Sequence, residues 1–182
     1  KRRRPATQGA WREGLTPAQR TDRGRAAQEA ATERFHYLYD NHPLWDLDQA
    51  GRLDGVWKAW VDFANSEAFL GAMREITGES RIAFADAQVT RYRRGHLLTA
   101  HDDGVEGKNR YFAYVMNLTP RWKIEWGGLL MFHGDDGHVA EAFLPNFNSL
   151  NLLKVPALHS VSQVSLFAGD DRLAITGWLR GR

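Results

Sequence analysis

The stretch "HLLTAHDDGVEGKNRYFAYVMNL" (residues 96–118) joins two β-rich runs through a charged turn. Six more short β-rich runs lie between residues 82 and 180, separated by turn sequences such as "HGDDGH", "LPNFN" and "AGDD". Eight short strands after a helical layer favour a barrel or jelly roll over a parallel α/β sheet. The sequence therefore predicts a mainly β fold with some α-helix.

Two amphipathic helices are predicted ahead of these strands. Residues 53–64 place their apolar side chains on one helical face. Ser66 can cap a second helix, which Gly78 ends. We therefore expect a single domain (residues 1–182) made of a basic flexible tail, a mainly helical support and a jelly-roll core, at residues 1–15, 16–80 and 82–180.

The positive charge of the chain is concentrated at its N-terminus. Residues 1–26 carry eight Lys/Arg and two Asp/Glu, a net charge of +6, whereas the remainder has a net charge of −4. A basic segment can contact nucleic acid or an acidic partner, but we favour a solvated tail at residues 1–15. Residues 17–33 are typical of a polar helix with Thr16 as its N-cap.

Three features that the sequence lacks narrow the class of protein. The chain has no cysteine, which excludes disulfides and thiolate metal sites and fits a reducing compartment. No apolar run approaches the ~20 residues that span a bilayer, and no signal peptide is visible. We therefore expect a cytoplasmic protein that does not enter the membrane.

The sequence "AHDD" (residues 100–103) suggests a metal site. Side chains alternate between the two faces of a strand, so His101 and Asp103 are expected to share a face. His159 opens a later β-rich run and is the best third ligand. Two histidines and one carboxylate, with the remaining positions open, are typical of non-haem Fe(II) oxygenases. Surface charge is the alternative, because the H-x-D pattern alone is a weak signal.

A cation in the last β-rich run adds specificity to this hypothesis. Arg172 lies 13 residues beyond His159 and starts the next predicted strand. A guanidinium binds a carboxylate through two hydrogen bonds and stays charged at all physiological pH values. We therefore expect Arg172 to hold a carboxylate cosubstrate beside the metal.

The segments "YRRGHLLTAHDD", "SLNLLKVPALHSVSQVS" and "RLAITGW" resemble the 2-oxoglutarate- and Fe(II)-dependent oxygenases. The resemblance covers roughly residues 84–180 and is strongest to prolyl-4-hydroxylase-like proteins, which include hydroxylases of ribosomal and translation-factor prolines. It implies a double-stranded β-helix (jelly roll) as the fold. It also implies Fe(II), 2-oxoglutarate and O₂ as reactants, with ascorbate in support.

The resemblance assigns roles to individual residues. His101, Asp103 and His159 would bind iron. Arg172 would pair with the distal carboxylate of 2-oxoglutarate, and Tyr92 would help to hold the same molecule. Because Asp103 is present, the resemblance implies a hydroxylase.

Two positions depart from the pattern of this family. Asn117 stands where the family often has Tyr, and its shorter side chain can still donate a hydrogen bond to the cosubstrate. Ala174 stands where the family often has Ser, and Thr176 on the same strand face can compensate. Trp178 matches a tryptophan of the family motif, which we interpret as a packing residue.

The substrate is the least determined part of the hypothesis. The leading interpretation is hydroxylation of a prolyl residue in a protein. The alternatives are hydroxylation of a free amino acid or small metabolite, and a metal-binding jelly-roll protein without catalysis. Arg110, Arg121 and Trp122 lie in loops expected to border the substrate. An exposed sheet edge would also allow a homodimer.

Overall fold

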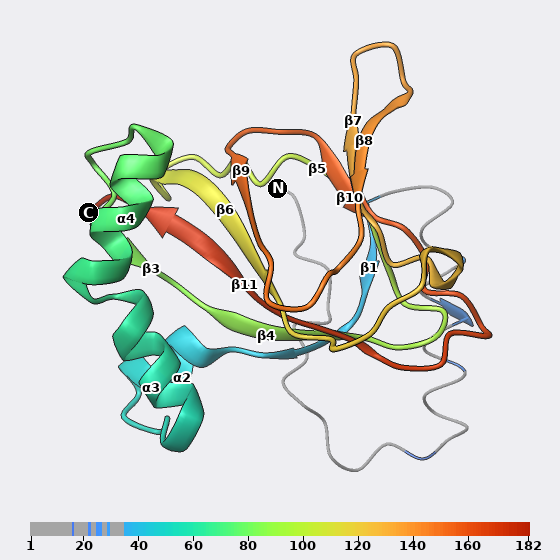
Figure 1. The fold of residues 1–182 in the computed structure, drawn as a ribbon, viewed down its shortest axis with the longest axis horizontal. Helices are drawn as coiled ribbons and strands as arrows, with labels where there is room; N and C mark the ends of the chain where they lie inside the picture. Colours follow the sequence, from blue (N-terminus) through green and yellow to red (C-terminus); the bar gives the residue numbers. More distant parts are fainter. Residues whose placement is uncertain (1–15, 17–21, 23–24, 27–28, 30–34) are drawn as a thin grey trace.

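The structure, a computed structural model, describes residues 16, 22, 25–26, 29 and 35–182. The predicted tail at residues 1–15 and most of the predicted helix at 17–33 lie outside the described residues. In the described part, two antiparallel β-sheets face each other, and helices cover the outer face of one of them (Figure 1).

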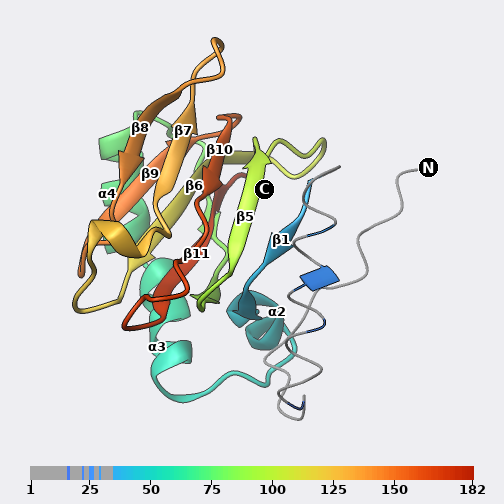
Figure 2. The ribbon, with the colours of Figure 1, turned by 90° about the vertical axis from the view of Figure 1, so that its right-hand side faces the viewer.

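The first sheet has five strands in the order β1–β5–β10–β7–β8. Figure 2 shows these strands side by side, with the β7–β8 hairpin projecting beyond its neighbours. The strands are β1 (Tyr37–Leu38), β5 (Leu97–His101), β10 (His159–Val161), β7 (Leu130–His133) and β8 (Val139–Phe143).

The second sheet has β11 (Arg172–Arg180) at its centre, hydrogen-bonded to strands on both sides. Its order is β2–β4–β11–β6–β9, and β3 pairs with the end of β11. The other strands are β2 (Asp40–His42), β3 (Phe84–Ala85), β4 (Gln88–Tyr92), β6 (Arg110–Asn117) and β9 (Leu150–Lys154).

Three helices support the second sheet: α2 (Leu44–Gln49), α3 (Gly55–Ala64) and α4 (Glu67–Thr77). The hydroxyl of Ser66 accepts a hydrogen bond from the backbone N–H of Phe69 at 3.3 Å, which caps α4. Gly78 ends this helix with a φ of 69°, a conformation that glycine adopts without steric cost. Both predicted amphipathic helices are therefore confirmed.

Alternation along β11 explains how one strand serves two layers. Ile175 and Leu179 are buried in the core that the sheet forms with the helices. Trp178, with the opposite parity, packs instead against the cluster between the two sheets that contains Leu130. Arg172 shares the parity of Trp178, so the inner face of the barrel receives the residues expected to carry function.

The predicted mainly β fold with supporting helices is confirmed, and two strand predictions need correction. The run at 82–93 is split into β3 and β4, because the Asp86 carboxylate accepts a hydrogen bond from the backbone N–H of Trp178 at 2.7 Å. The run at 159–167 forms a strand only as far as Val161, after which pairing continues as one bridge between Gly127 and Val164.

No helix among the described residues is long and apolar enough to cross a bilayer. Among the helices α2, α3 and α4, the longest is α4, with 11 residues and a length of about 16 Å at 1.5 Å per residue. This finding agrees with the absence of a long apolar run from the sequence.

Candidate metal centre and cosubstrate pocket

The structure brings His101, Asp103 and His159 together between the sheets. Each offers one ligand atom, and these atoms all lie within 4.8 Å of one another. The Nε2 atom of His101 lies 3.4 Å from one carboxylate oxygen of Asp103, and that of His159 lies 3.5 Å from the other. Three ligand atoms converging on one point can hold a single metal ion.

Strand pairing positions the two histidines. His101 is the last residue of β5 and His159 the first of β10, and the two stand directly opposite each other. Their Nδ1 atoms are hydrogen-bonded to the carbonyls of Thr99 and Ala157, at 3.1 Å and 2.7 Å. These bonds hold the Nδ1 protons, so that both Nε2 lone pairs face the site.

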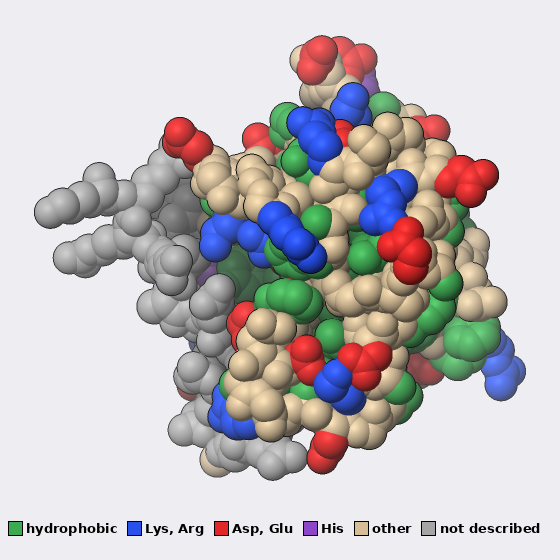
Figure 3. Space-filling view, turned by 90° about the vertical axis from the view of Figure 1, so that its left-hand side faces the viewer, with side chains coloured by type: hydrophobic (Ala, Val, Ile, Leu, Met, Phe, Trp, Pro, Cys, Tyr) green, Lys and Arg blue, Asp and Glu red, His purple; other side chains and the backbone are tan. Residues whose placement is uncertain are grey.

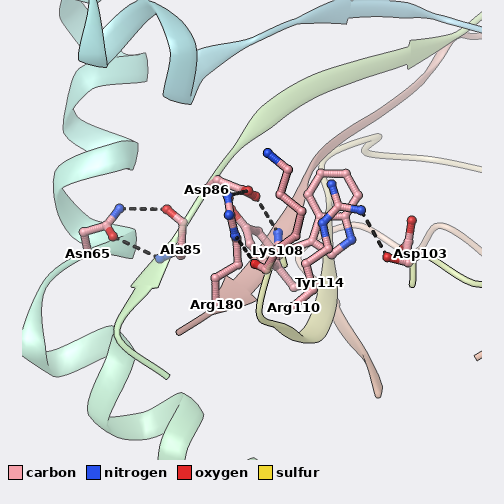
Figure 4. A network of polar contacts seen from close by, with 9 residues as sticks. Asn65, Ala85, Asp86, Asp103, Lys108, Arg110, Tyr114 and Arg180 are labelled. Atoms are coloured by element: carbon pink, nitrogen blue, oxygen red, sulfur yellow. Dashed lines mark hydrogen bonds and ion pairs between the residues drawn. The ribbon is translucent and has the colours of Figure 1, made fainter. Parts of the chain in front are cut away.

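Asp103 reaches the centre by a different route from the one predicted. β5 ends at His101, so strand alternation does not place Asp103, and its φ of 60° lies in the left-handed region. Aspartate tolerates this conformation better than most residues. The guanidinium of Arg110 donates a hydrogen bond to the Asp103 carbonyl at 3.1 Å, which fixes the turn (Figure 4).

The protonation states at the centre suit a cation. Burial raises the pKa of Asp103, but hydrogen bonding and charge from His101, charge from His159 and the indole of Trp178 together lower it below its usual range. Burial also lowers the pKa of His159. At neutral pH the carboxyl is therefore ionised and the His159 imidazole is neutral, the forms that bind metal.

Arg172 is a buried cation without a counter-ion in the part of the chain that the structure describes. Its side chain is 3% exposed, and no carboxylate pairs with it among the described residues. Its Nε atom has no hydrogen-bond partner, and burial lowers its pKa. A buried charge is costly unless it is paired, so this guanidinium is built to receive an anionic ligand.

Aromatic side chains surround the buried Arg172. Tyr92 stands directly opposite on β4, and its ring centroid lies 5.1 Å from the guanidinium carbon. Burial raises the pKa of Tyr92, so its hydroxyl stays a hydrogen-bond donor. Gly128 has a φ of 63°, and a Cβ there would lie 3.1 Å from Cγ2 of Val164 and 3.3 Å from the ring of Trp122.

Asn117 lies on the same inner surface, directly opposite Ala174. It is 1% exposed, and its Nδ2 atom donates to Asn151 at 2.9 Å and to the Ser149 hydroxyl at 3.1 Å. Its Oδ1 atom has no partner. Since the amide N–H groups are already engaged, Asn117 does not offer the cosubstrate a free donor in this conformation.

Two further residues of this surface were missed by the sequence analysis. Thr90 is 2% exposed, stands opposite Ala174 and donates its hydroxyl proton to the Ala174 carbonyl at 3.3 Å. Asn151 is the partner of the Asn117 amide. Alternation from Tyr92 would have found Thr90, which lies two residues earlier. The hydroxyl oxygen of Thr176, the predicted substitute for a missing hydroxyl, accepts a hydrogen bond from the Gln88 amide at 3.3 Å.

The three substrate candidates occupy different environments. Arg110 lies beside the centre, with its guanidinium carbon 3.5 Å from the ring centroid of Trp178. Trp178, interpreted as a packing residue, is thus also a neighbour of Asp103. Trp122 donates to the Gly127 carbonyl at 2.8 Å and closes the Arg172 pocket. Arg121 lines a surface hollow that contains none of the three ligands, so the structure does not bring it to the centre.

A polar network connects this centre to the helical layer (Figure 4). Arg180 pairs with the Asp86 carboxylate at 3.2 Å and donates to the Lys108 carbonyl at 3.0 Å. The Tyr114 hydroxyl donates to the Asp86 carbonyl at 2.8 Å. The loop after Asp103 is therefore tied to the end of β11.

Figure 3 shows the side of the molecule where α4 and the C-terminus lie. The surface there is hollowed between hydrophobic, Lys and Arg side chains.

A family model described as "2OG-Fe(II) oxygenase superfamily" matches residues 87–180, slightly more than half of the chain. The chain belongs to this superfamily. The match begins before Tyr92 and ends after Arg172, so it includes every residue of the centre and pocket. The resemblance noted from the sequence is thereby confirmed.

Several known proteins similar to this chain are named prolyl hydroxylases. Prolyl 3-hydroxylase OGFOD1 of Xenopus laevis is 33% identical over 122 residues, and its Mus musculus counterpart is 30% identical. These alignments cover 63% of this chain but only 23% and 22% of those proteins, so the chain spans about a quarter of their length. A Pseudomonas putida prolyl-4-hydroxylase has a similar fold, with a TM-score of 0.61, 19% identity, and coverage of 88% of this chain and 85% of that one.

Fe(II) and 2-oxoglutarate, the groups that this family implies, fit the residues present. Two imidazoles and one carboxylate are the donor set expected for Fe(II) with open positions for other ligands. The guanidinium of Arg172, whose Nε atom has no hydrogen-bond partner among the described residues, could pair with one carboxylate of a dicarboxylate whose other end would bind the metal. The two histidines and Arg172 lie on facing sheets.

Proposed function

We propose that this chain is an Fe(II)- and 2-oxoglutarate-dependent dioxygenase that hydroxylates a prolyl residue of a polypeptide. The observation that carries the proposal is the combination, between the same two sheets, of the three-residue centre with the unpaired, buried guanidinium of Arg172. A structural ion pair would have supplied Arg172 with a carboxylate from the chain itself. The prolyl substrate is supported by the prolyl hydroxylases among the sequence relatives.

Each residue has a distinct task in this proposal. His101, Asp103 and His159 hold the iron, and Arg172 anchors the distal carboxylate of 2-oxoglutarate. When bound together, Fe(II), 2-oxoglutarate and O₂ supply the oxidation that turns the cosubstrate into succinate and CO₂ and hydroxylates a C–H bond. The two sheets exclude water from this reaction and fix its geometry.

Arg110 and Trp178 are placed to orient the substrate. The Arg110 side chain is half-buried, and its Nε atom has no partner among the described residues. It can therefore donate a hydrogen bond to a backbone carbonyl of a bound peptide. The Trp178 ring beside it offers an apolar surface to a pyrrolidine ring. This pair would hold the target proline next to Asp103.

We propose carbon 3 of the prolyl ring as the site of hydroxylation. The sequence relatives at 30–33% identity are named prolyl 3-hydroxylases. The prolyl-4-hydroxylases appear only as fold neighbours of lower identity. Amino-acid analysis of a hydroxylated product against authentic 3- and 4-hydroxyproline would decide between the two carbons.

The direct test is succinate formation from 2-oxoglutarate with Fe(II), ascorbate and air, with proline-containing peptides and with free proline. We expect the parent to form succinate and to add 16 Da to a peptide, and His101→Ala and Arg172→Ala to do neither. His138→Ala and Arg121→Ala are matched controls, because both side chains are exposed and lie away from the centre.

The outcomes separate the competing functions. Hydroxylation of free proline but of no peptide would replace the proposal with a small-molecule hydroxylase. No succinate, together with no calorimetric binding of 2-oxoglutarate to the metal-loaded parent, would overturn the oxygenase activity and leave a non-catalytic metal-binding protein.

A further inference from the structure

The β7–β8 hairpin ends the first sheet in an exposed edge strand. All five residues of β8 (Val139–Phe143) are exposed, and β7 is its only strand neighbour among the described residues. The hairpin projects beyond the rest of the sheet in both ribbon views (Figures 1 and 2). Its inner face is therefore open to a large ligand that approaches the barrel.

The register of the sheet carries a straight row of side chains from the metal centre to this edge. His101 stands opposite His159, and His159 stands opposite Phe132. Phe132 in turn stands opposite Glu141. Directly opposed residues of neighbouring strands point to the same face of a sheet. Glu141 is thus on the same face as the two metal-binding histidines, two strands from His159, or about 10 Å at the usual strand spacing.

The surface between the centre and Glu141 is aromatic. The ring centroid of Phe132 lies 6.3 Å from that of His159 and 5.9 Å from that of Phe143. Phe143, two residues from Glu141 on the same strand face, is 39% exposed. A chain lying across these side chains would lead directly from Glu141 to the metal.

The carboxylate of Glu141 has no cationic partner among the residues that the structure describes. Arg110, from the facing sheet, lies beside the centre and forms no salt bridge with a carboxylate among the described residues. The row of the histidines is therefore flanked by an anion on one sheet and a cation on the other. Such an arrangement selects the charge and the direction of a bound peptide.

We infer that Glu141 is a specificity-determining residue that pairs with a Lys or Arg side chain near the target proline of a polypeptide substrate. This inference rests on the proposed function. An extended chain advances about 3.3 Å per residue, and a lysine side chain reaches roughly 6 Å from its Cα. The partner cation therefore belongs one to three residues from the proline.

The test uses three nine-residue peptides with a central proline, which carry lysine, norleucine or glutamate two residues to either side. Binding of each labelled peptide is measured by fluorescence anisotropy with Mn(II) and 2-oxoglutarate, and hydroxylation by mass with Fe(II). The variants are Glu141→Gln and Glu141→Lys. Asp135→Asn is the matched control, since this exposed acid in the hairpin turn changes the net charge equally.

We expect the parent to bind the lysine peptide about fivefold more tightly than the norleucine peptide at low salt, because an exposed ion pair contributes little. The preference should shrink at high salt. Glu141→Gln should abolish it and Glu141→Lys should reverse it toward the glutamate peptide. Asp135→Asn should keep it, and succinate formation without peptide should be the same in all variants.

Other results separate this inference from the proposed function. Equal hydroxylation of all three peptides by the parent and by Glu141→Gln would overturn the role of Glu141 and leave the proposed function intact. Charge-selective binding that depends on Glu141, without hydroxylation, would support its role and overturn prolyl hydroxylation. If neither charge-selective binding nor hydroxylation were observed, both the role of Glu141 and the proposed function would be overturned.

Discussion

The pocket around Arg172 and the edge around Glu141 receive charged groups in opposite ways. Arg172 is 3% exposed and its ligand must be stripped of water to reach it. Glu141 lies on a strand that is exposed throughout. A fixed small ligand is held best by a buried, preformed charge, whereas a long and variable one is selected at low cost by exposed charges. The fold thus places tight binding of the cosubstrate and discrimination between substrates at two different sites.

The strongest way to break this comparison is to remove the buried charge. Arg172→Met should weaken binding of 2-oxoglutarate to the Mn(II)-loaded protein by a factor of 100 or more, as expected for a buried charge pair worth about 3–5 kcal/mol. The ligand-free variant should unfold at a higher temperature than the parent, because an unpaired buried charge has been lost. Calorimetry and thermal unfolding measure the two effects.

Arg121→Met is the control for this variant, because it removes an exposed guanidinium outside the centre. Unchanged binding in Arg172→Met would show that the cosubstrate carboxylate is held elsewhere.

The metal centre should be nearly as sensitive. Asp103→Asn keeps a side chain that tolerates the φ of 60° but removes the charge. We expect roughly 100-fold weaker Co(II) binding, followed through the visible absorption of the bound ion, with little change in the unfolding temperature. Asp102→Asn, one residue earlier and on an exposed side chain, is the matched control. Equal Co(II) affinity in both variants would exclude Asp103 as a ligand.

Arg110 connects the two regions, and its loss should have an intermediate effect. Arg110→Gln removes the stacking on Trp178 and weakens the hold on the Asp103 turn. We expect about tenfold lower kcat/KM for a prolyl peptide, with a smaller loss of peptide-independent succinate formation. The rates of peptide hydroxylation and of peptide-independent succinate formation are measured in the same samples and compared. Equal losses would mean that Arg110 acts only through the metal centre.

A smaller change should improve the buried pocket. Ala174→Ser restores a hydroxyl opposite Asn117, on the face of β11 that also carries Arg172, from which it can donate to the cosubstrate. One added hydrogen bond contributes about 0.5–1.5 kcal/mol, so we expect 2-oxoglutarate to bind two- to tenfold more tightly. Isothermal titration of parent and variant, with Thr176→Ser as control, tests this. Weaker binding would indicate that the pocket has no space for the hydroxyl.

The smallest effect concerns pH. Burial is the main cause that lowers the pKa of His96, whose Nδ1 atom has no hydrogen-bond partner. As the pH falls through the unfolded value of about 6.5, the unfolded chain binds a proton that the folded chain does not. The free energy of unfolding should therefore decrease from pH 7 to pH 5.5. His96→Gln should flatten this dependence in urea titrations, whereas His138→Gln should not.

The sequence predicted the layers of this fold better than its irregular joints. The periodicity of residues 53–64 and the caps at Ser66 and Gly78 identified two helices, because those signals are local. The split at Asp86 depends on a side-chain bond to β11, which lies more than 90 residues away in the chain. No local pattern reports a contact of that kind.

The candidate site shows the same division. His101, Asp103 and His159, which the sequence analysis grouped as metal ligands, lie together in the structure, yet the reason given for Asp103 was wrong, since a left-handed turn and not strand alternation places it. The occupied amide of Asn117 and the row that ends at Glu141 depend on the register between strands. Register is set by the whole sheet, so it became visible only in the structure.

The left-handed backbone at Asp103 also limits how this centre can decay during evolution. Few residue types accept a φ near 60°, and among the small ones asparagine and glycine do so readily. Replacement by either would remove the carboxylate and spare both sheets and the guanidinium of Arg172. A descendant with either residue would keep the fold and the buried cation of Arg172 while losing one of the three metal ligands. The proposed catalysis can therefore be lost by a single substitution before any loss of the fold.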